Sequence, residues 1–328
     1  MPVRVATVRA ADVPATQTNF PFYVDLGRVG ATALTLADAN SSRWYTDTDL
    51  VTQMAREIVS LTEGHGKYAS LTSTSKIAID YDGIRADYAV TATYGRNNVW
   101  GDFESVQHFQ SNSNDSTANG RNGSDSGITY TTGKFGQSAS NLSGSGKITL
   151  PSFSLSAAFS SSFWVKYNAL QATAIFSTYG GANGSSTGAN IANSFPYING
   201  SLQSGYTNFL VDAGWVASGQ TTGVWYKFNY VHDGTTIRIY LNGVQVNSGN
   251  VPHSTVDRVM YLMSRGDNAQ ALNGYLDEFY IKNSQDSANW ITTEYNNQND
   301  EATFWGTWTT FGGGPAAVNA RRLFLMMV

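Results

Sequence analysis

Apolar and polar residues alternate in short segments along the first hundred residues. Four of these segments are predicted strands: residues 20–26, 55–61, 76–81 and 88–94. In the last of them, every second residue from Tyr88 to Tyr94 falls on one face, the period of two expected of a strand with one buried side. Glu63-Gly64-His65-Gly66 and Asp82-Gly83 are predicted turns between the strands. The pattern predicts a small all-β domain over residues 18–99, with residues 1–17 as an N-terminal arm.

A second run of strand-like segments follows a polar stretch. Residues 110–146 are rich in Ser, Asn and Gly, and we interpret them as the looped opening of a second domain. The clearer predicted strands beyond them cover residues 162–167, 174–177, 207–211, 225–231, 236–241, 244–246 and 275–281. Asp233-Gly234 and Asn242-Gly243 predict two consecutive hairpins, because both dipeptides tolerate positive φ in two-residue turns.

The second domain is predicted to be a two-sheet sandwich with one helix. Short strands at this spacing are typical of a β-sandwich or jelly roll, which here covers residues 100–311. A helix is predicted from Ser287 to Tyr295, because Ile291 and Tyr295 lie four residues apart and Ser287 can cap the first turn. Residues 312–328 follow as a C-terminal tail. The predicted fold class is therefore all-β.

Composition argues against several functional classes. The 20 Lys and Arg residues against 24 Asp and Glu residues give a net charge of −4, and charged residues make up 13% of the chain, where about 25% is usual. Because no Lys/Arg-rich block occurs, we expect neither nucleic acid nor a membrane as a partner. The absence of cysteine excludes disulfides, thiolate catalysis and cysteine-ligated zinc, and it leaves the compartment open.

The two ends of the sequence show no clear targeting signal. Residues 1–15 lack the apolar run that a signal peptide needs, so we expect no secretion by the standard route. No stretch of about 18 apolar residues occurs that could span a bilayer. The apolar end from Leu323 to Val328 fits an edge strand or a tail packed on a neighbour better than a targeting signal.

A series of short motifs in the second domain occurs in the order found in a known fold family. They are the segments 115–123, 133–138, 163–165, 223–227, 240–244, 274–279 and 294–297. Together they resemble the concanavalin A-like, laminin-G-like jelly rolls of bacterial and phage proteins, over roughly residues 100–311. Each motif alone is weak, and their order carries the resemblance.

The first domain resembles the small β-domain of unknown function that commonly precedes such jelly rolls in bacterial surface proteins and phage virion proteins. Its opening from Val13 to Leu26 matches, and Tyr45-Thr46-Asp47 and Arg56-Glu57-Ile58 stand at the expected later positions. Tyr94-Gly95-Arg96-Asn97 departs from the pattern, which has paired tyrosines before the glycine. Since that family has no established chemistry, the resemblance implies architecture rather than activity.

No arrangement of residues predicts catalysis. Glucanases with a concanavalin A-like sandwich use a pair of carboxylates on the same face of one strand, whereas Asp277 and Glu278 are adjacent and predicted to point to opposite faces. Four histidines are scattered without ligand spacing and are interpreted as core or surface residues rather than a metal cluster: His65, His108, His232 and His253. We therefore expect a protein that is not an enzyme.

One loop has the composition of a cation site. Asp115, Thr117 and Asn119 place oxygen-bearing side chains at alternate positions, which hard cations favour. Jelly rolls of the resembled type often bind structural calcium between this loop and the acidic residue of the penultimate strand, here Asp277 or Glu278. The resemblance thus implies a Ca²⁺ site formed by Asp115, Asn119, Asp277 and Glu278. The alternative is that Asp115 and Asn119 only hold the turn through hydrogen bonds to the backbone.

Aromatic and amide side chains gather between residues 179 and 215. Rings pack against the CH faces of sugars and amides bind their hydroxyl groups. The candidate glycan-binding residues are Tyr179, Asn183, Asn190, Tyr197, Tyr206 and Trp215. The alternative is that these rings fill the ends of the sandwich.

These observations predict a non-enzymatic structural protein of a phage virion, in capsid decoration or associated with the tail, with a lectin-like surface that binds glycans. The absent signal peptide and cysteine, the two-domain length and the polar, weakly charged composition favour this function. The expected partners are other virion proteins, copies of itself and host-surface glycans, and the expected location is the virion. The alternative is a glycan-binding adhesion module of a bacterial surface or secreted protein.

Overall fold

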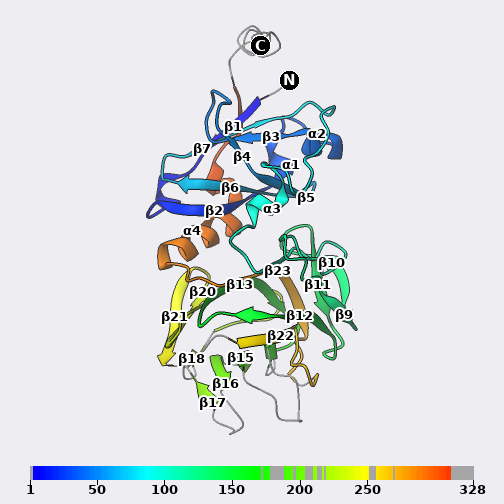
Figure 1. The fold of residues 1–328 in the computed structure, drawn as a ribbon, viewed down its shortest axis with the longest axis vertical. Helices are drawn as coiled ribbons and strands as arrows, with labels where there is room; N and C mark the ends of the chain where they lie inside the picture. Colours follow the sequence, from blue (N-terminus) through cyan, green and yellow to red (C-terminus); the bar gives the residue numbers. More distant parts are fainter. Residues whose placement is uncertain are drawn as a thin grey trace.

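The computed structural model describes residues 3–170, 173–177, 188–194, 197–203, 210–212, 216–217, 219–250, 256–268 and 270–311. Two groups of antiparallel sheets lie one beyond the other along the long axis of the molecule, with helix α4 (Ala288–Asn299) between them (Figure 1). We call them the N-terminal sheets, which contain β1–β7 and β24, and the sandwich, which contains β8–β23. This mostly-β architecture confirms the predicted fold class.

The N-terminal sheets contain five and three strands. The larger has the order β24 (Thr309–Thr310), β1 (Val3–Thr7), β7 (Lys76–Asp80), β3 (Arg43–Tyr45) and β4 (Gln53–Met54). The smaller has the order β2 (Gln17–Val24), β6 (Glu63–Leu71) and β5 (Arg56–Ser60). Short helical segments accompany them: η1 (Ala10–Asp12), α1 (Leu26–Val29), α2 (Leu36–Ser41), α3 (Arg96–Val99) and α5 (Glu301–Trp305). These short helices were not predicted.

The sandwich consists of two eight-stranded sheets. The first has the order β10 (Thr129–Thr132), β11 (Gln137–Asn141), β23 (Gly274–Lys282), β13 (Ala158–Tyr167), β19 (Trp225–Asp233), β20 (Thr236–Leu241) and β21 (Val244–Asn250), and β8 (Ser105–Gln107) also pairs with β23. The second has the order β17 (Leu210–Asp212), β16 (Tyr197–Gln203), β15 (Gly188–Ser194), β14 (Thr173–Ser177), β22 (Val256–Leu262), β12 (Lys147–Leu155) and β9 (Ser124–Ser126), and β18 (Val216–Ala217) pairs with β16.

An apolar core lies between the two sheets of the sandwich. Phe163, Phe228 and Phe279 of the first sheet share this core with Ile148 and Leu262 of the second. The predicted hairpins join β19, β20 and β21, and Asn242 and Gly243 have the positive φ of 50° and 79° that their turn requires. Alternation and turn chemistry therefore located this sheet correctly.

Helix α4 packs on both parts of the molecule. Ser287 caps it by accepting a hydrogen bond from the backbone N–H of Trp290, as predicted. Toward the N-terminal sheets, the ring of Trp290 lies 4.7 Å from that of Phe20 in an edge contact. Toward the sandwich, Tyr295 stacks on Trp164 of β13 at 6.0 Å. One helix near the end of the sequence thus joins the two groups of sheets.

The C-terminal tryptophans pack on the N-terminal sheets. Trp305 and Trp308 belong to the apolar core formed by those sheets. The indole N–H of Trp305 donates to the carbonyl of Tyr23 at 3.0 Å, and Arg4 donates to the carbonyl of Trp308 at 2.8 Å. The predicted tail, residues 312–328, lies outside the described residues.

Two local predictions were wrong. Residues 88–94 form turns rather than a strand, with backbone hydrogen bonds from Ala92 to Ala89 and from Gly95 to Ala92. Alternation alone misled here because a strand also needs a neighbour with which to pair. Residues 63–66 are not a turn but the first half of β6. The residues predicted to form an arm, 1–17, include β1, which pairs with both β7 and β24. The division of the chain into domains stays a prediction.

Candidate functional site

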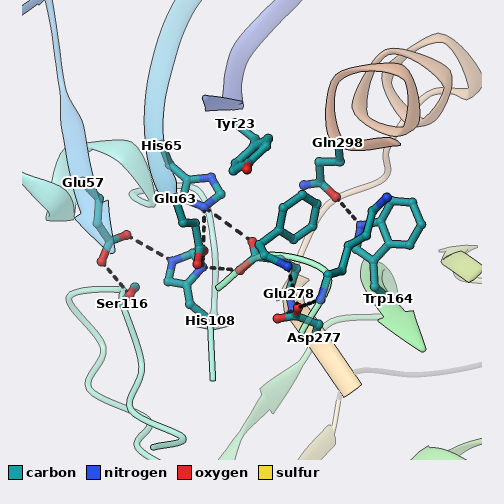
Figure 2. Close-up of polar contacts among 12 residues, drawn as sticks. Tyr23, Glu57, Glu63, His65, His108, Ser116, Trp164, Asp277, Glu278 and Gln298 are labelled. Atoms are coloured by element: carbon teal, nitrogen blue, oxygen red, sulfur yellow. Dashed lines mark hydrogen bonds and ion pairs between the residues drawn. The ribbon is translucent and has the colours of Figure 1, made fainter. Parts of the chain in front are cut away.

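A cluster of ionisable side chains is buried where the N-terminal sheets meet the sandwich (Figure 2). Glu63 and His65 come from β6, His108 follows β8, and Glu278 lies in β23. All four are buried, and one possible ligand atom from each lies within 4.8 Å of those of the others. Residues up to 215 positions apart in the sequence are therefore neighbours in the fold.

Strand β6 directs Glu63 and His65 toward the sandwich. Alternate residues of a strand share a face, so Gly64 and Gly66 occupy the opposite one. A Cβ at Gly66 would lie 2.5 Å from the ring of Phe22 and 2.8 Å from that of Trp44. Without side chains, the two glycines let β6 pack closely against these rings. The glycines that suggested a turn therefore serve the packing of a strand.

A bulge in β23 brings Glu278 to the cluster. Leu276 and Phe279 both point into the sandwich core, so the two residues between them share the outer face. The pairing with β13 shifts register here, and Glu278 has a positive φ of 50°. The prediction that Asp277 and Glu278 point to opposite faces was therefore wrong, because it assumed a regular strand.

Short polar contacts connect the cluster. His108 Nδ1 lies 2.6 Å from Glu278 Oε1 and 3.1 Å from Glu63 Oε1. His108 Nε2 lies 3.2 Å from Glu57 Oε2. His65 Nε2 lies 3.1 Å from Glu63 Oε1 and 3.6 Å from Glu278 Oε2.

Surrounding donors hold the carboxylates in place. Trp100 Nε1 and Ser116 Oγ donate to Glu57, the latter at 2.8 Å. Gln110 Nε2 donates to Glu63 Oε2 at 2.7 Å. The outer partners thus fix the orientation of Glu63 in the cluster and of Glu57, which contacts His108 from outside it.

Burial and charge shift the pKa values of the cluster in different directions. Burial lowers the pKa of His65 to about 4, and burial together with the charge of Glu278 raises the pKa of Glu63 well above its usual value. Burial opposes charge on His108, but Glu278 and Glu57 outweigh it and raise the pKa of His108 well above its usual value. Burial also opposes ionisation of Glu278, yet His108 and His65 lower its pKa to about 2. At neutral pH an imidazolium at His108 faces ionised Glu278 and Glu57.

The cluster can hold a metal ion, because its imidazole nitrogens and carboxylate oxygens converge. His65 and His108 are buried core residues, as one of the two predicted interpretations had it, but they lie together rather than scattered. They are separated by 43 positions in sequence, and only the pairing of β6 with its neighbours and of β8 with β23 brings them together. Glu63 and His65 on one strand face were the local signal that sequence reasoning missed.

In the predicted calcium loop, the side chain of Asp115 forms hydrogen bonds that hold the loop itself. Asp115 accepts hydrogen bonds from the backbone N–H groups of Val106, Thr117 and Arg121 at 2.9, 3.0 and 2.8 Å, and from the hydroxyl of Thr117 at 2.7 Å. The amide of Asn119 donates to two backbone carbonyls. These donors occupy the carboxylate as in the turn alternative, so the loop does not fit Ca²⁺ well.

The acidic pair of β23 is divided between two networks. Asp277 accepts hydrogen bonds from the backbone N–H groups of Lys134 and Phe135 at 2.8 and 3.0 Å. Burial and the charge of Glu278 raise the pKa of Asp277 well above its usual value. Glu278 instead belongs to the histidine cluster. The other two predicted calcium ligands, Asp115 and Asn119, form hydrogen bonds in and around their own loop.

Most of the predicted glycan-binding residues lie outside the part of the chain that the structure describes. Tyr179, Asn183, Tyr206 and Trp215 lie outside the described residues. Asn190 and Tyr197 lie in β15 and β16, for which the structure describes the backbone. Their role stays a prediction.

A polar cleft of about 550 Å³ opens between β2 and the segment after β23. Its exposed walls carry hydroxyl, amide and carboxylate groups, and the rings of Phe103 and Trp290 lie at its buried floor. The lining residues are Thr16, Gln17, Thr18, Asn19, Asp102, Phe103, Lys282, Asn283, Ser284, Gln285, Asp286, Ser287 and Trp290. Both groups of sheets therefore contribute to it.

Among the described residues, no helix is long and apolar enough to cross a membrane.

Comparisons with solved structures found similar folds at low sequence identity. Domain 4 of AbnA, an extracellular arabinanase from Geobacillus stearothermophilus in complex with arabinotriose, is 21% identical, with a TM-score of 0.43 over 58% of this chain and 97% of that one. The binding domain of Paraclostridial Mosquitocidal Protein 1 is 15% identical, with a TM-score of 0.48 over 63% and 55%. The binding domain of botulinum neurotoxin serotype D is 15% identical, with a TM-score of 0.47 over 60% and 52%. The chain thus spans about half the length of these two toxin domains.

One family model matches the sequence of the sandwich. No curated protein matches the chain in sequence. The family model described as the concanavalin A-like lectin/glucanases superfamily matches residues 142–292, which include β12–β23 and the first half of α4. Residues 142–292 are therefore a concanavalin A-like domain, as the order of the sequence motifs predicted.

Proposed function

We propose that this protein is a non-catalytic carbohydrate-binding protein and a structural component of a phage virion, in capsid decoration or associated with the tail. The observation that carries the non-catalytic role is the state of the acidic pair on β23. Asp277 and Glu278 are 0% and 5% exposed, and their oxygens contact backbone amides and histidines of the protein itself. A glycosidase needs two carboxylates facing a scissile bond.

Carbohydrate is the ligand class that the fold and the cleft support. The matched family includes lectins and glucanases. The cleft has the volume range of a small-molecule site, and its exposed groups, such as Thr18, Ser284 and Gln285, can donate to and accept from sugar hydroxyls. Lys282 covers the Trp290 ring at 3.9 Å, so hydroxyl recognition rather than ring stacking is the expected mode in this cleft.

A glycan array followed by titration tests the carbohydrate role. We expect the purified protein to bind a subset of glycans without hydrolysing them. Ser284→Trp should block the cleft, Trp215→Ala should weaken binding at the predicted loop site, and Thr307→Trp, at an exposed position outside the cleft lining, is the control. Retained wild-type affinity in both test variants, or release of reducing sugar from the bound glycan, would contradict the proposal.

The virion setting rests on the polar, weakly charged composition and on the resemblance of the N-terminal region to a small β-domain of phage virion proteins, which also occurs in bacterial surface proteins. Mass spectrometry of nuclease-treated, density-banded particles from the source culture tests it. We expect the protein in these particles in constant ratio to the major capsid protein. Recovery only in the cell-envelope fraction would favour the alternative, an adhesion module of a bacterial surface protein.

A further inference from the structure

We propose that Glu63, His65, His108 and Glu278 bind a divalent transition-metal ion of the zinc class at the junction of the N-terminal sheets and the sandwich. Three separate parts of the chain supply the ligands: β6, the residue after β8, and β23. Such an ion would connect the two groups of sheets directly.

The spacing of the ligand atoms fits a small ion. Nitrogen-to-oxygen distances among these residues are 2.6, 3.1, 3.1 and 3.6 Å, the first and the last to different oxygens of Glu278. With one ligand atom from each residue, the four atoms lie within 4.8 Å of one another. Zinc binds nitrogen and oxygen at about 2.0–2.1 Å in tetrahedral sites, which places neighbouring ligand atoms roughly 3.3 Å apart. Small side-chain adjustments would therefore complete the coordination shell.

The chemistry of the donors selects the class of ion. Two imidazoles and two carboxylates suit zinc and neighbouring transition metals. Calcium and magnesium prefer an all-oxygen shell, which His65 and His108 cannot supply. The cluster thus differs in kind from the calcium site predicted at Asp115.

The partners around the cluster are those of a metal site. When a histidine binds a metal through one ring nitrogen, the other usually donates to a carboxylate or carbonyl. His108 Nδ1 faces the cluster, and its Nε2 lies 3.2 Å from Glu57 Oε2 (Figure 2). Glu57 is held in turn by Trp100 and Ser116, and Glu63 by Gln110. This outer layer is independent of the ligand spacing and orients two of the four ligands.

Electrostatics also favours a dication. Glu57, Glu63 and Glu278 place three carboxylates in a buried space that two histidines share. A buried negative charge is costly unless it is paired or coordinates a metal. A divalent ion bound through His108 Nδ1 would replace the proton by which that ring contacts Glu278, and it would have Glu63 and Glu278 as its carboxylate ligands.

The test uses full-length protein without an affinity tag, stripped with a chelator and passed over a desalting column. We expect one equivalent of Zn²⁺ to be retained after gel filtration, measured by elemental mass spectrometry. We expect Zn²⁺ to raise the melting temperature by mass action, whereas Ca²⁺ should not. Co²⁺ should give the intense visible absorption of a tetrahedral site with nitrogen and oxygen ligands.

Variants separate this site from adventitious binding. His65→Gln and Glu63→Gln should each weaken Zn²⁺ binding 10-fold or more and abolish the Co²⁺ spectrum, while Glu104→Gln, which changes a part-exposed carboxylate outside the cluster, should bind as the wild type does. Melting without metal checks that each variant folds. Absence of a tetrahedral Co²⁺ spectrum in the wild type, or unchanged Zn²⁺ binding in folded His65→Gln, would overturn the proposal.

Discussion

Replacing His108 should remove the charge that holds the buried carboxylates in the metal-free protein. The imidazole faces Glu278 at 2.6 Å and Glu57 at 3.2 Å, and all three side chains are at most 8% exposed. In His108→Gln, a neutral amide faces two carboxylates that water cannot reach. Breaking a buried ion pair by removing one partner typically costs about 3–5 kcal/mol.

The pKa of Glu278 reports on the surroundings of its carboxylate. Its pKa falls from 4.5 to about 2 in the folded protein, despite burial and chiefly because of His108. That difference of about 2.5 units corresponds to about 3 kcal/mol at 1.36 kcal/mol per unit. This figure is the net of burial, which opposes ionisation, and of His108, His65 and hydrogen bonds, which favour it, so it describes the whole surroundings of Glu278 and not one pair.

The sign of the pH dependence follows from the two shifts. Glu278 has a lowered pKa, so its contribution to stability is present above pH 4.5 and is lost as the pH falls toward 2. His108 has a raised pKa, so its contribution is present below pH 6.5 and is lost as the pH rises through its folded value. The stabilisation by this pair is therefore greatest between pH 4.5 and 6.5.

Urea denaturation of chelator-treated protein from pH 3 to 8, followed by tryptophan fluorescence, measures these effects. We expect His108→Gln to be destabilised by about 3 kcal/mol at pH 6, and by less at pH 3, where Glu278 is protonated in the unfolded protein although it stays ionised in the folded wild type. A double-mutant cycle with Glu278→Gln isolates the pair. The control cycle is Arg121 with Glu104, a part-exposed pair at 2.7 Å, which should give about 1 kcal/mol or less. Equal coupling energies in the two cycles, or a loss at pH 3 as large as at pH 6, would refute the reasoning.

Three further predictions address the fold and the calcium alternative. Gly66→Ala should cost about 1–3 kcal/mol in urea denaturation because its Cβ would overlap Phe22 and Trp44, whereas Gly101→Ala, with its nearest neighbour atom 3.6 Å away, should be close to neutral. Glu294→Gln should cost about 3–5 kcal/mol because it leaves Lys227 buried without its partner at 3.0 Å, and a loss below 1 kcal/mol would contradict this. Adding Ca²⁺ to chelator-treated protein should leave the melting temperature unchanged, because hydrogen bonds of its own loop occupy Asp115; a rise that Asp115→Ala abolishes would restore the predicted calcium site.

Local signals in the sequence were sufficient to predict the strands and turns of the sandwich and the start of helix α4. Asn242-Gly243 required a turn with positive φ, and Ser287 stood where a helix cap was needed. Such signals depend on neighbours in sequence, and they hold wherever the chain has a partner strand. Residues 88–94 show the limit, because their alternation is as regular as that of a strand but no pairing with a neighbouring strand forms there.

The candidate site depends on contacts that local patterns do not encode. The two glycines of Glu63-Gly64-His65-Gly66 indicated a turn, although their role is to let β6 pack against Phe22 and Trp44. Likewise, the bulge that moves Glu278 onto the face of Asp277 is a mismatch between β13 and β23, not a property of either strand alone. The histidine cluster combines these two features, so neither strand by itself predicts it.

The junction between the two groups of sheets is polar as well as apolar, and this bears on how the protein presents a binding surface. Helix α4 contributes Glu294 to an ion pair with Lys227 of the sandwich, while its Asn297 exchanges hydrogen bonds with the backbone of Tyr23 in β2. Apolar contacts tolerate sliding, whereas paired charges and directional hydrogen bonds are satisfied in one arrangement. The cleft is formed by residues of both parts, such as Thr18 and Gln285, so its shape depends on that arrangement. A fixed junction therefore preorganises the cleft, so that a ligand of the proposed kind would bind without the cost of ordering the two parts of the protein.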